Sequence, residues 1–134
     1  MIIMVMDGQG GGIGAEIIKG LRNKLVADLE ILALGTNSSA TSRMMKAGAN
    51  KGATGENAIV ITSQRADVIM GPLAIIISNS MMGEVTPKMT EAVCSSNARK
   101  ILIPLTQENV RIIGISGEPL PHLVDQSIKL IKET

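Results

Sequence analysis

MIIMVMDGQGGGIG, residues 1–14, joins a short apolar run to a cluster of glycines. Residues 1–6 have the length and the β-branched content of a strand that is buried in a parallel sheet. After the glycines, apolar residues recur with the spacing of a buried helical face, at Ile13, Ile17, Ile18, Leu21 and Leu25. A strand, a glycine turn and a helix in this order are typical of the start of an α/β fold.

The alternation of strands and helices continues along the chain. A buried strand is predicted over residues 29–34 and a capped helix over 40–47. Residues 48–55 are small and predict a loop. We expect a helix over 55–66, because Thr54 and Glu56 suit a helix start, and then a strand over 67–71.

The second half of the chain is less regular. Residues 73–82 combine isoleucines that favour a strand with small polar residues that favour a turn, so that segment is left open. Thr86 followed by Pro87 predicts the start of a helix. Residues 101–105 and 110–115 have the pattern of strands, and the five-residue link between them suits an antiparallel pair.

A last amphipathic helix is expected from about Leu120. The pattern as a whole predicts one Rossmann-like domain over residues 1–134, with three layers. Its sheet would be mostly parallel, with about five strands and an antiparallel edge strand.

Composition excludes several functional classes. The 134 residues carry 13 basic and 12 acidic side chains, and Phe, Tyr and Trp are absent. Without aromatic platforms, nucleic-acid binding is not expected. One Cys and one His form neither an internal disulfide nor a His/Cys zinc site, so no metal site is predicted, although a metal held only by carboxylates stays open. We expect a cytoplasmic protein with no membrane segment.

The glycine loop is the strongest functional signal. A glycine at position 8 allows a tight turn, those in the middle let a phosphate approach bare amides, and Gly14 lets the helix pack on the strand. We therefore predict that a nucleotide or dinucleotide phosphate binds here, on Asp7, Gly8, Gln9, Gly10, Gly11, Gly12, Ile13 and Gly14. The alternative is a turn that merely needs glycines, with Asp7 as its cap.

Polar residues after the later strands would complete the site. An NAD site has an acidic residue at the end of the second strand, but Gly35 follows Leu34 there. Arg43 suggests contact with a phosphate, such as the 2′-phosphate of NADP, or else it is a solvated side chain. The cofactor is predicted to be NADP, NAD or another nucleotide, with further contacts from Thr36, Asn37, Ser38, Gly71 and Pro72.

Three resemblances accompany these motifs. The spacing Gly8-x-x-x-Gly12-x-Gly14 resembles the short-chain dehydrogenase signature, but the chain lacks the Tyr which that family uses, so the resemblance ends at cofactor binding. Residues 10–14, 35–43 and 66–72 look like a shortened 2-phospho-lactate transferase and gluconeogenesis-factor family, which implies nucleotide or nucleotide-sugar ligands. As a whole, the chain resembles a small family of uncharacterised bacterial proteins through residues 7–14, 54–58 and 83–89, and this implies a Rossmann-like fold without an activity.

Three functions follow as hypotheses. The first is a nucleotide-binding domain, and the second is an assembly or regulatory module without a ligand, in which methionines provide adaptable packing. The third is a small transferase acting on a phosphorylated metabolite. Glu84, Thr86 and Lys88 suggest an anion contact or simple helix capping, and no catalytic pair stands out. A homo-oligomer is expected, because 134 residues leave little room for a dinucleotide and a substrate together.

Overall fold

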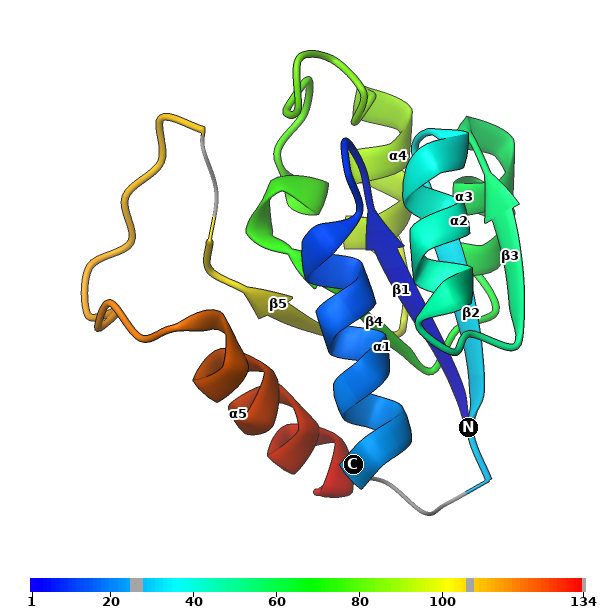
Figure 1. The fold of residues 1–134 in the computed structure, drawn as a ribbon. Coiled ribbons are helices and arrows are strands. Elements are labelled where there is room, and N and C mark those ends of the chain that lie inside the picture. The colour runs from blue at the N-terminus through cyan, green and yellow to red at the C-terminus, as the bar shows by residue number, and fades with distance from the viewer. Residues whose placement is uncertain (25–27, 106–107, 134) are drawn as a thin grey trace.

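A computed structural model describes residues 1–24, 28–105 and 108–133 (Figure 1). Strands and helices alternate along most of the chain. The strands are β1 (Ile2–Asp7), β2 (Glu30–Gly35), β3 (Lys51–Thr54), β4 (Val68–Pro72) and β5 (Arg99–Ile103). The helices are α1 (Gly12–Lys24), α2 (Ser38–Lys46), α3 (Glu56–Ser63), α4 (Pro87–Ser95) and α5 (Leu120–Lys132), with a short 3₁₀ helix, η1 (Leu73–Ile76), after β4.

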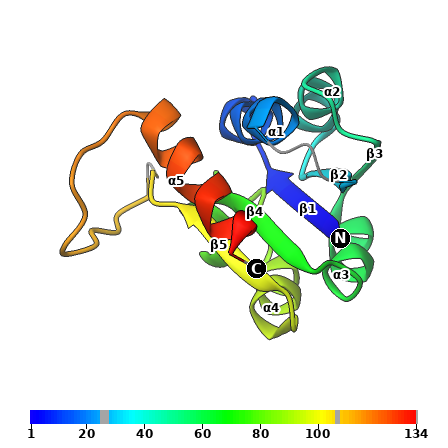
Figure 2. The same cartoon turned by 90° about the horizontal axis from the view of Figure 1, so that it is seen from below.

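The five strands form one sheet in the order β3-β2-β1-β4-β5, and every pair in it is parallel. Figure 2 shows α1, α2 and α5 on one face of this sheet and α3 and α4 on the other. The prediction of a three-layer Rossmann-like α/β fold is therefore confirmed. The predicted antiparallel edge strand is not present among the described residues.

Side chains of β1 alternate between the two faces, as the pleat of a strand requires. Ile3 and Val5 lie in the apolar cluster beneath α1 and α5, whereas Met4 and Met6 lie in the cluster beneath α3 and α4. Both methionines are fully buried. In a chain without aromatic residues, their flexible side chains fill space that Phe or Trp fills in other cores.

Most predicted elements agree with the structure to within a few residues. The helix predicted over 55–66 and the strand over 67–71 correspond to α3 and β4. Residues 73–82, which the sequence left open, contain η1 followed by turns. Leu25, which was expected to extend the apolar face of α1, lies outside the described residues.

Two predictions about strands were wrong. Residues 48–55 were expected to form a loop, yet Lys51–Thr54 is the edge strand β3, paired with β2. All four of its residues are exposed, so main-chain hydrogen bonds rather than apolar burial form this strand. Residues 110–115 were expected to be an antiparallel strand, but they form an exposed, irregular segment, and among the described residues β5 has no sheet partner on its outer side. An apolar run becomes a strand only where a neighbouring strand pairs with it.

The contact between α1 and α5 depends on Gly20. A Cβ built on Gly20 would lie 2.6 Å from Val124 Cγ1 and 2.8 Å from Ile128 Cδ1, so Gly20→Val forces the helices apart. Overpacking costs about 1–3 kcal/mol, which exceeds the gain of up to about 1 kcal/mol from replacing a mid-helix glycine. We expect urea denaturation to show net destabilisation. Gly117→Val, with no atom within 4 Å of its Cβ, is the control, and equal stability of both variants would contradict this packing.

Candidate functional site

A pocket opens at the carboxyl ends of β1 and β4, where the strand order reverses. From β1 the chain passes outward to β2 and β3, and from β4 it passes the other way to β5. Ligands of open α/β sheets bind at this switch point. The pocket has a volume of about 720 Å³ and is lined by residues 7–13, Pro72, Ala74, Asn79, Met81, Met82, Leu105 and Glu108.

Asp7 binds both ends of the glycine loop. It is buried, and its Oδ1 accepts a hydrogen bond from the Gly8 amide at 2.8 Å, while its Oδ2 accepts one from the Gly14 amide at 2.8 Å. Burial raises the pKa of this carboxyl, and the amides of Gly14, Gly8 and Ile13 together with the charge of Arg43 offset only part of that rise. The first turn of α1 therefore already binds the carboxylate of Asp7.

Three glycines of the loop are required by packing. A Cβ on Gly8 would lie 2.4 Å from Thr36 Oγ1, and one on Gly14 would lie 2.5 Å from Met44 Sδ. Gly11 has a φ of +73°, and its Cβ would lie 2.9 Å from Ala40 Cα. These positions let β1, the loop and α2 approach closely.

Gly10 and Gly12 differ from these three glycines. A Cβ on either would meet only the Arg43 guanidinium, at 3.8 Å from Gly10 and 3.5 Å from Gly12. Within the described residues, their amides bond to no protein acceptor, whereas those of Gly8, Gly11 and Gly14 do. Packing therefore does not explain why these two positions lack a side chain.

Arg43 reaches the loop from α2. Its Nη1 donates a hydrogen bond to the Gly10 carbonyl at 3.3 Å, and the side chain is exposed. It also lines an open hollow of about 540 Å³ with Ser38, Ser39, Ser42 and Lys46. The structure thus places Arg43 beside the glycine loop and Ser38 in the neighbouring hollow.

Glu84 is a residue whose place in the site sequence reasoning missed. Its Oε1 accepts hydrogen bonds from the Gln9 amide at 2.8 Å, from Thr36 Oγ1 at 2.7 Å and from Asn37 Nδ2 at 2.8 Å. Asn37 also caps α2 through its Oδ1, which accepts from the Ala40 amide. Desolvation opposes ionisation of Glu84, but these three hydrogen bonds outweigh it and hold its pKa below the usual value.

The sequence carried only a weak signal for this contact. Glu84 lies 47 positions from Asn37, in a turn that was interpreted as an anion contact or a helix cap. Its carboxylate stands near the end of β2, where the sequence itself supplies no acidic residue. A carboxylate there is what a ribose site requires.

The segment over residues 79–83 forms one wall of the pocket in a strained conformation. Asn79, Met81 and Met82 have φ values of +65°, +55° and +57°, a region that costs a residue with a side chain about 1–2 kcal/mol. The Met81 amide donates to Glu108 Oε1 at 2.7 Å, and the Asn79 amide donates to the Val85 carbonyl at 2.7 Å. These bonds hold Met82, 97% exposed, at the pocket rim.

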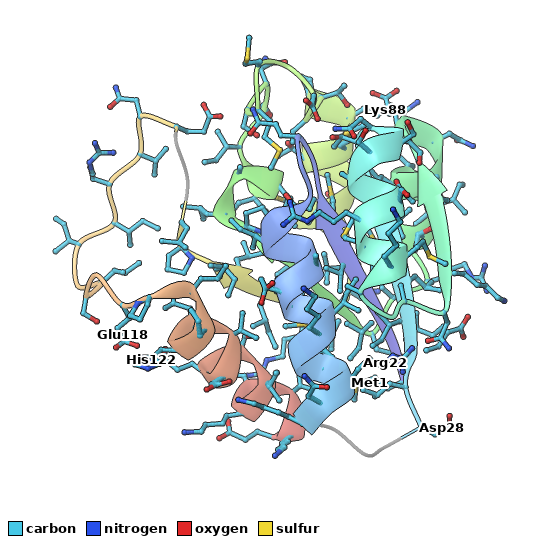
Figure 3. All side chains as sticks on the ribbon, viewed as in Figure 1. Met1, Arg22, Asp28, Lys88, Glu118 and His122 are labelled. Carbon is cyan, nitrogen blue, oxygen red and sulfur yellow. The ribbon has the colours of Figure 1, made fainter. Side chains whose placement is uncertain are left out.

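Of the two predicted site residues at the end of β4, only one reaches the pocket. Gly71 is packed on β1, since its Cβ would lie 2.3 Å from the Met6 carbonyl oxygen, whereas Pro72 reaches the pocket. Figure 3 places His122 beside Glu118 at the start of α5, away from the glycine loop. Among the described residues, no cluster of three or more His, Cys, Asp or Glu could hold a metal ion, and no helix is long and apolar enough to cross a membrane.

Asp7 gives the stability of the fold a defined pH dependence. Because its pKa is higher in the folded than in the unfolded chain, the folded state keeps the proton longer, and the stabilisation is lost as pH rises through the folded pKa. The free energy of unfolding of the wild type minus that of Asp7→Asn should therefore fall as pH rises above about 4. Urea denaturation of both proteins at several pH values measures this difference. A difference that grows with pH would show that the amide hydrogen bonds outweigh burial.

Glu84 should behave in the opposite sense. Because the pKa of Glu84 is lower in the folded chain, its ionised form stabilises the folded state at pH values above the usual carboxyl pKa. That stabilisation is lost as pH falls through the pKa of the folded chain. Glu84→Gln keeps the shape but removes the charge, so we expect destabilisation at neutral pH that disappears in acid. The exposed Glu16→Gln is the matched control in thermal unfolding. If both variants unfold alike at neutral pH, Glu84 does not anchor the loop.

Comparisons with known proteins assign the chain to a family and find similar solved structures. No curated protein matches the chain. Among solved structures, the fold is similar to that of a dodecameric FMN-dependent UbiX-like decarboxylase from Escherichia coli O157:H7. The TM-score is 0.48 at 13% sequence identity, over 98% of this chain and 74% of that one. The family model described as a domain of unknown function, DUF3842, matches residues 2–134, and the chain therefore belongs to this family.

Proposed function

We propose that residues 1–134 act as a nucleotide-binding domain whose glycine loop, residues 8–14, binds the phosphate of a nucleotide or dinucleotide. The observation that carries the proposal is the bare backbone at Gly10 and Gly12. Both glycines have room for a Cβ, have amides without a protein acceptor among the described residues, and lie beside the Arg43 guanidinium. Bare amides and a guanidinium together suit a phosphate.

Charge decides where on the loop the phosphate sits. The buried Asp7 carboxylate already accepts the amides of Gly8 and Gly14, so a second anion close to those two amides would be repelled. The Cβ positions of Gly10 and Gly12 face the Arg43 guanidinium. The phosphate therefore binds at the outer edge of the loop, and the rest of the ligand extends into the pocket between β1 and β4.

Glu84 refines which nucleotide is preferred. Thr36 and Asn37, expected to contact the cofactor, bond to Glu84 Oε1, which leaves the partly exposed carboxylate near the end of β2. A carboxylate accepts a hydrogen bond from a ribose hydroxyl and repels a 2′-phosphate. The site thus favours NAD or another nucleotide with a free ribose over NADP.

Thermal unfolding with added ligands tests the proposal. The ligands are NAD, NADP, ADP, GDP, UDP-sugars and inorganic phosphate, and a ligand at 100 times its dissociation constant adds about 2.7 kcal/mol of stability. Gly12→Val should abolish the shift without unfolding the chain, because a Cβ at this position meets only the flexible Arg43 side chain. Gly117→Val should keep the shift. No shift with any ligand, or an unchanged shift in Gly12→Val, would refute phosphate binding at the loop.

One observation favours a second candidate, an assembly or regulatory module without a nucleotide. Asp7 already accepts the Gly14 amide, which the first turn of α1 would otherwise offer to a ligand. In such a module the glycine loop serves packing alone. The transferase hypothesis rests on its sequence resemblance and is the third candidate.

A further inference from the structure

The pocket between β1 and β4 has two kinds of lining. One is the glycine loop, which offers polar backbone groups. The other, called here the apolar wall, consists of five apolar residues that follow β1 in the sequence at a distance: Pro72, Ala74, Met81, Met82 and Leu105. Asn79 and Glu108 line the pocket beside this wall. A ligand that fills the pocket therefore meets polar groups at the loop and apolar groups at the wall.

Two residues of the apolar wall keep surface that the fold leaves uncovered. Pro72, Ala74 and Met81 are buried, whereas Met82 is 97% exposed and Leu105 is 38% exposed. A single exposed apolar side chain is common on a protein surface. Met82 differs from that case because it stands at the rim of a pocket of about 720 Å³.

The backbone of Met82 is held in an unfavourable conformation. Its φ is +57°, and the flanking residues Met81 and Gly83 have φ values of +55° and +90°. The turn is closed by the Glu84 amide, which donates to the Met81 carbonyl at 3.1 Å. Because the Met82 side chain is almost fully exposed, it gains little packing in return for this strain. Strained residues of this kind cluster at ligand-binding sites.

The chemistry of the wall indicates what Met82 contacts. The chain has no Phe, Tyr or Trp on which an aromatic ligand could stack. A methionine sulfur makes favourable contacts with aromatic rings, and the unbranched side chain adapts to the ring that it meets. The exposed carboxamide of Asn79 both donates and accepts hydrogen bonds, as the edge of a nucleobase does.

We propose that the apolar wall binds the heteroaromatic ring of the nucleotide, with Met82 folded over the ring and Asn79 at its edge. This inference rests on the proposed function, in which the glycine loop binds the phosphate. Glu84, which accepts the ribose hydroxyl in that proposal, lies in the same turn two positions after Met82. One segment thus contacts both the ribose and the ring. The ligand is a nucleotide with an intact base, rather than a sugar phosphate or a free phosphate.

Methyl NMR of the full chain tests the ring contact. The methionine methyl groups are labelled with ¹³C, and because Phe, Tyr and Trp are absent, the ligand supplies the ring whose current shifts a methyl resonance. The probes are NAD, ADP, GDP and UDP-sugars, compared with pyrophosphate and ribose 5-phosphate, which lack a base. The Met82 resonance, assigned from Met82→Leu, should shift with a nucleotide and stay in place with the probes that lack a base. Met45 on α2, 37% exposed and outside the pocket lining, is the control.

Met82→Gly measures how much the contact contributes to binding. Glycine adopts a φ of +57° without steric cost, so the variant should unfold near the temperature of the wild type. Its dissociation constant for the nucleotide that shifts Met82 should rise about fivefold or more. Met45→Ala, at an exposed methionine outside the pocket, should leave that constant unchanged.

The outcomes separate this inference from the proposed function. A nucleotide that binds the wild type but not Gly12→Val, while the Met82 resonance stays in place or Met82→Gly binds as tightly as the wild type, would overturn the ring contact alone. The phosphate site at the loop would then stand. If no nucleotide binds the wild type, both proposals are refuted.

Discussion

The Asp7 carboxylate, buried between the amides of Gly8 and Gly14, joins the end of β1 to the start of α1. It accepts two donors that burial would otherwise leave without a partner, and such donors are costly in an interior. The turn it closes also brings α2 close, because Gly11 lies against the backbone of Ala40. The position of the pocket and the contact between Arg43 and the loop depend on this turn.

The same contact limits the chemistry of the site. The Asp7 carboxylate occupies the position that a ligand phosphate takes in many glycine loops. Negative and positive side chains therefore lie on different sides of the loop. Asp7 lies beneath it, Arg43 lies at its outer edge, and Glu84 joins it to the end of β2. Under the proposed function, a ligand would place its negative charge near Arg43 and its hydroxyl groups near Glu84.

Much of the fold could be predicted from local patterns, and the failures have a physical cause. Buried strands such as β1 and β4 carry continuous apolar runs, and α5 shows helical periodicity. The strand β3 is exposed, so its residues show no apolar pattern that could predict it. Hydrogen bonds to β2 form this strand. Residues 110–115 have a strand pattern without a partner strand, and pairing depends on the neighbour as much as on the sequence.

By itself, the sequence determined the buried strands and the helices, the glycine turn after β1 and the methionine-rich core, because hydrophobic spacing and backbone freedom are local properties. The tertiary structure alone decided which glycines are free of packing and which carboxylate reaches the end of β2. Gly8 and Gly12 look equivalent in the sequence, but only Gly8 faces Thr36 and Met81. Glu84 enters the site because the turns after η1 fold its carboxylate over the glycine loop, a contact between distant residues that no local pattern contains.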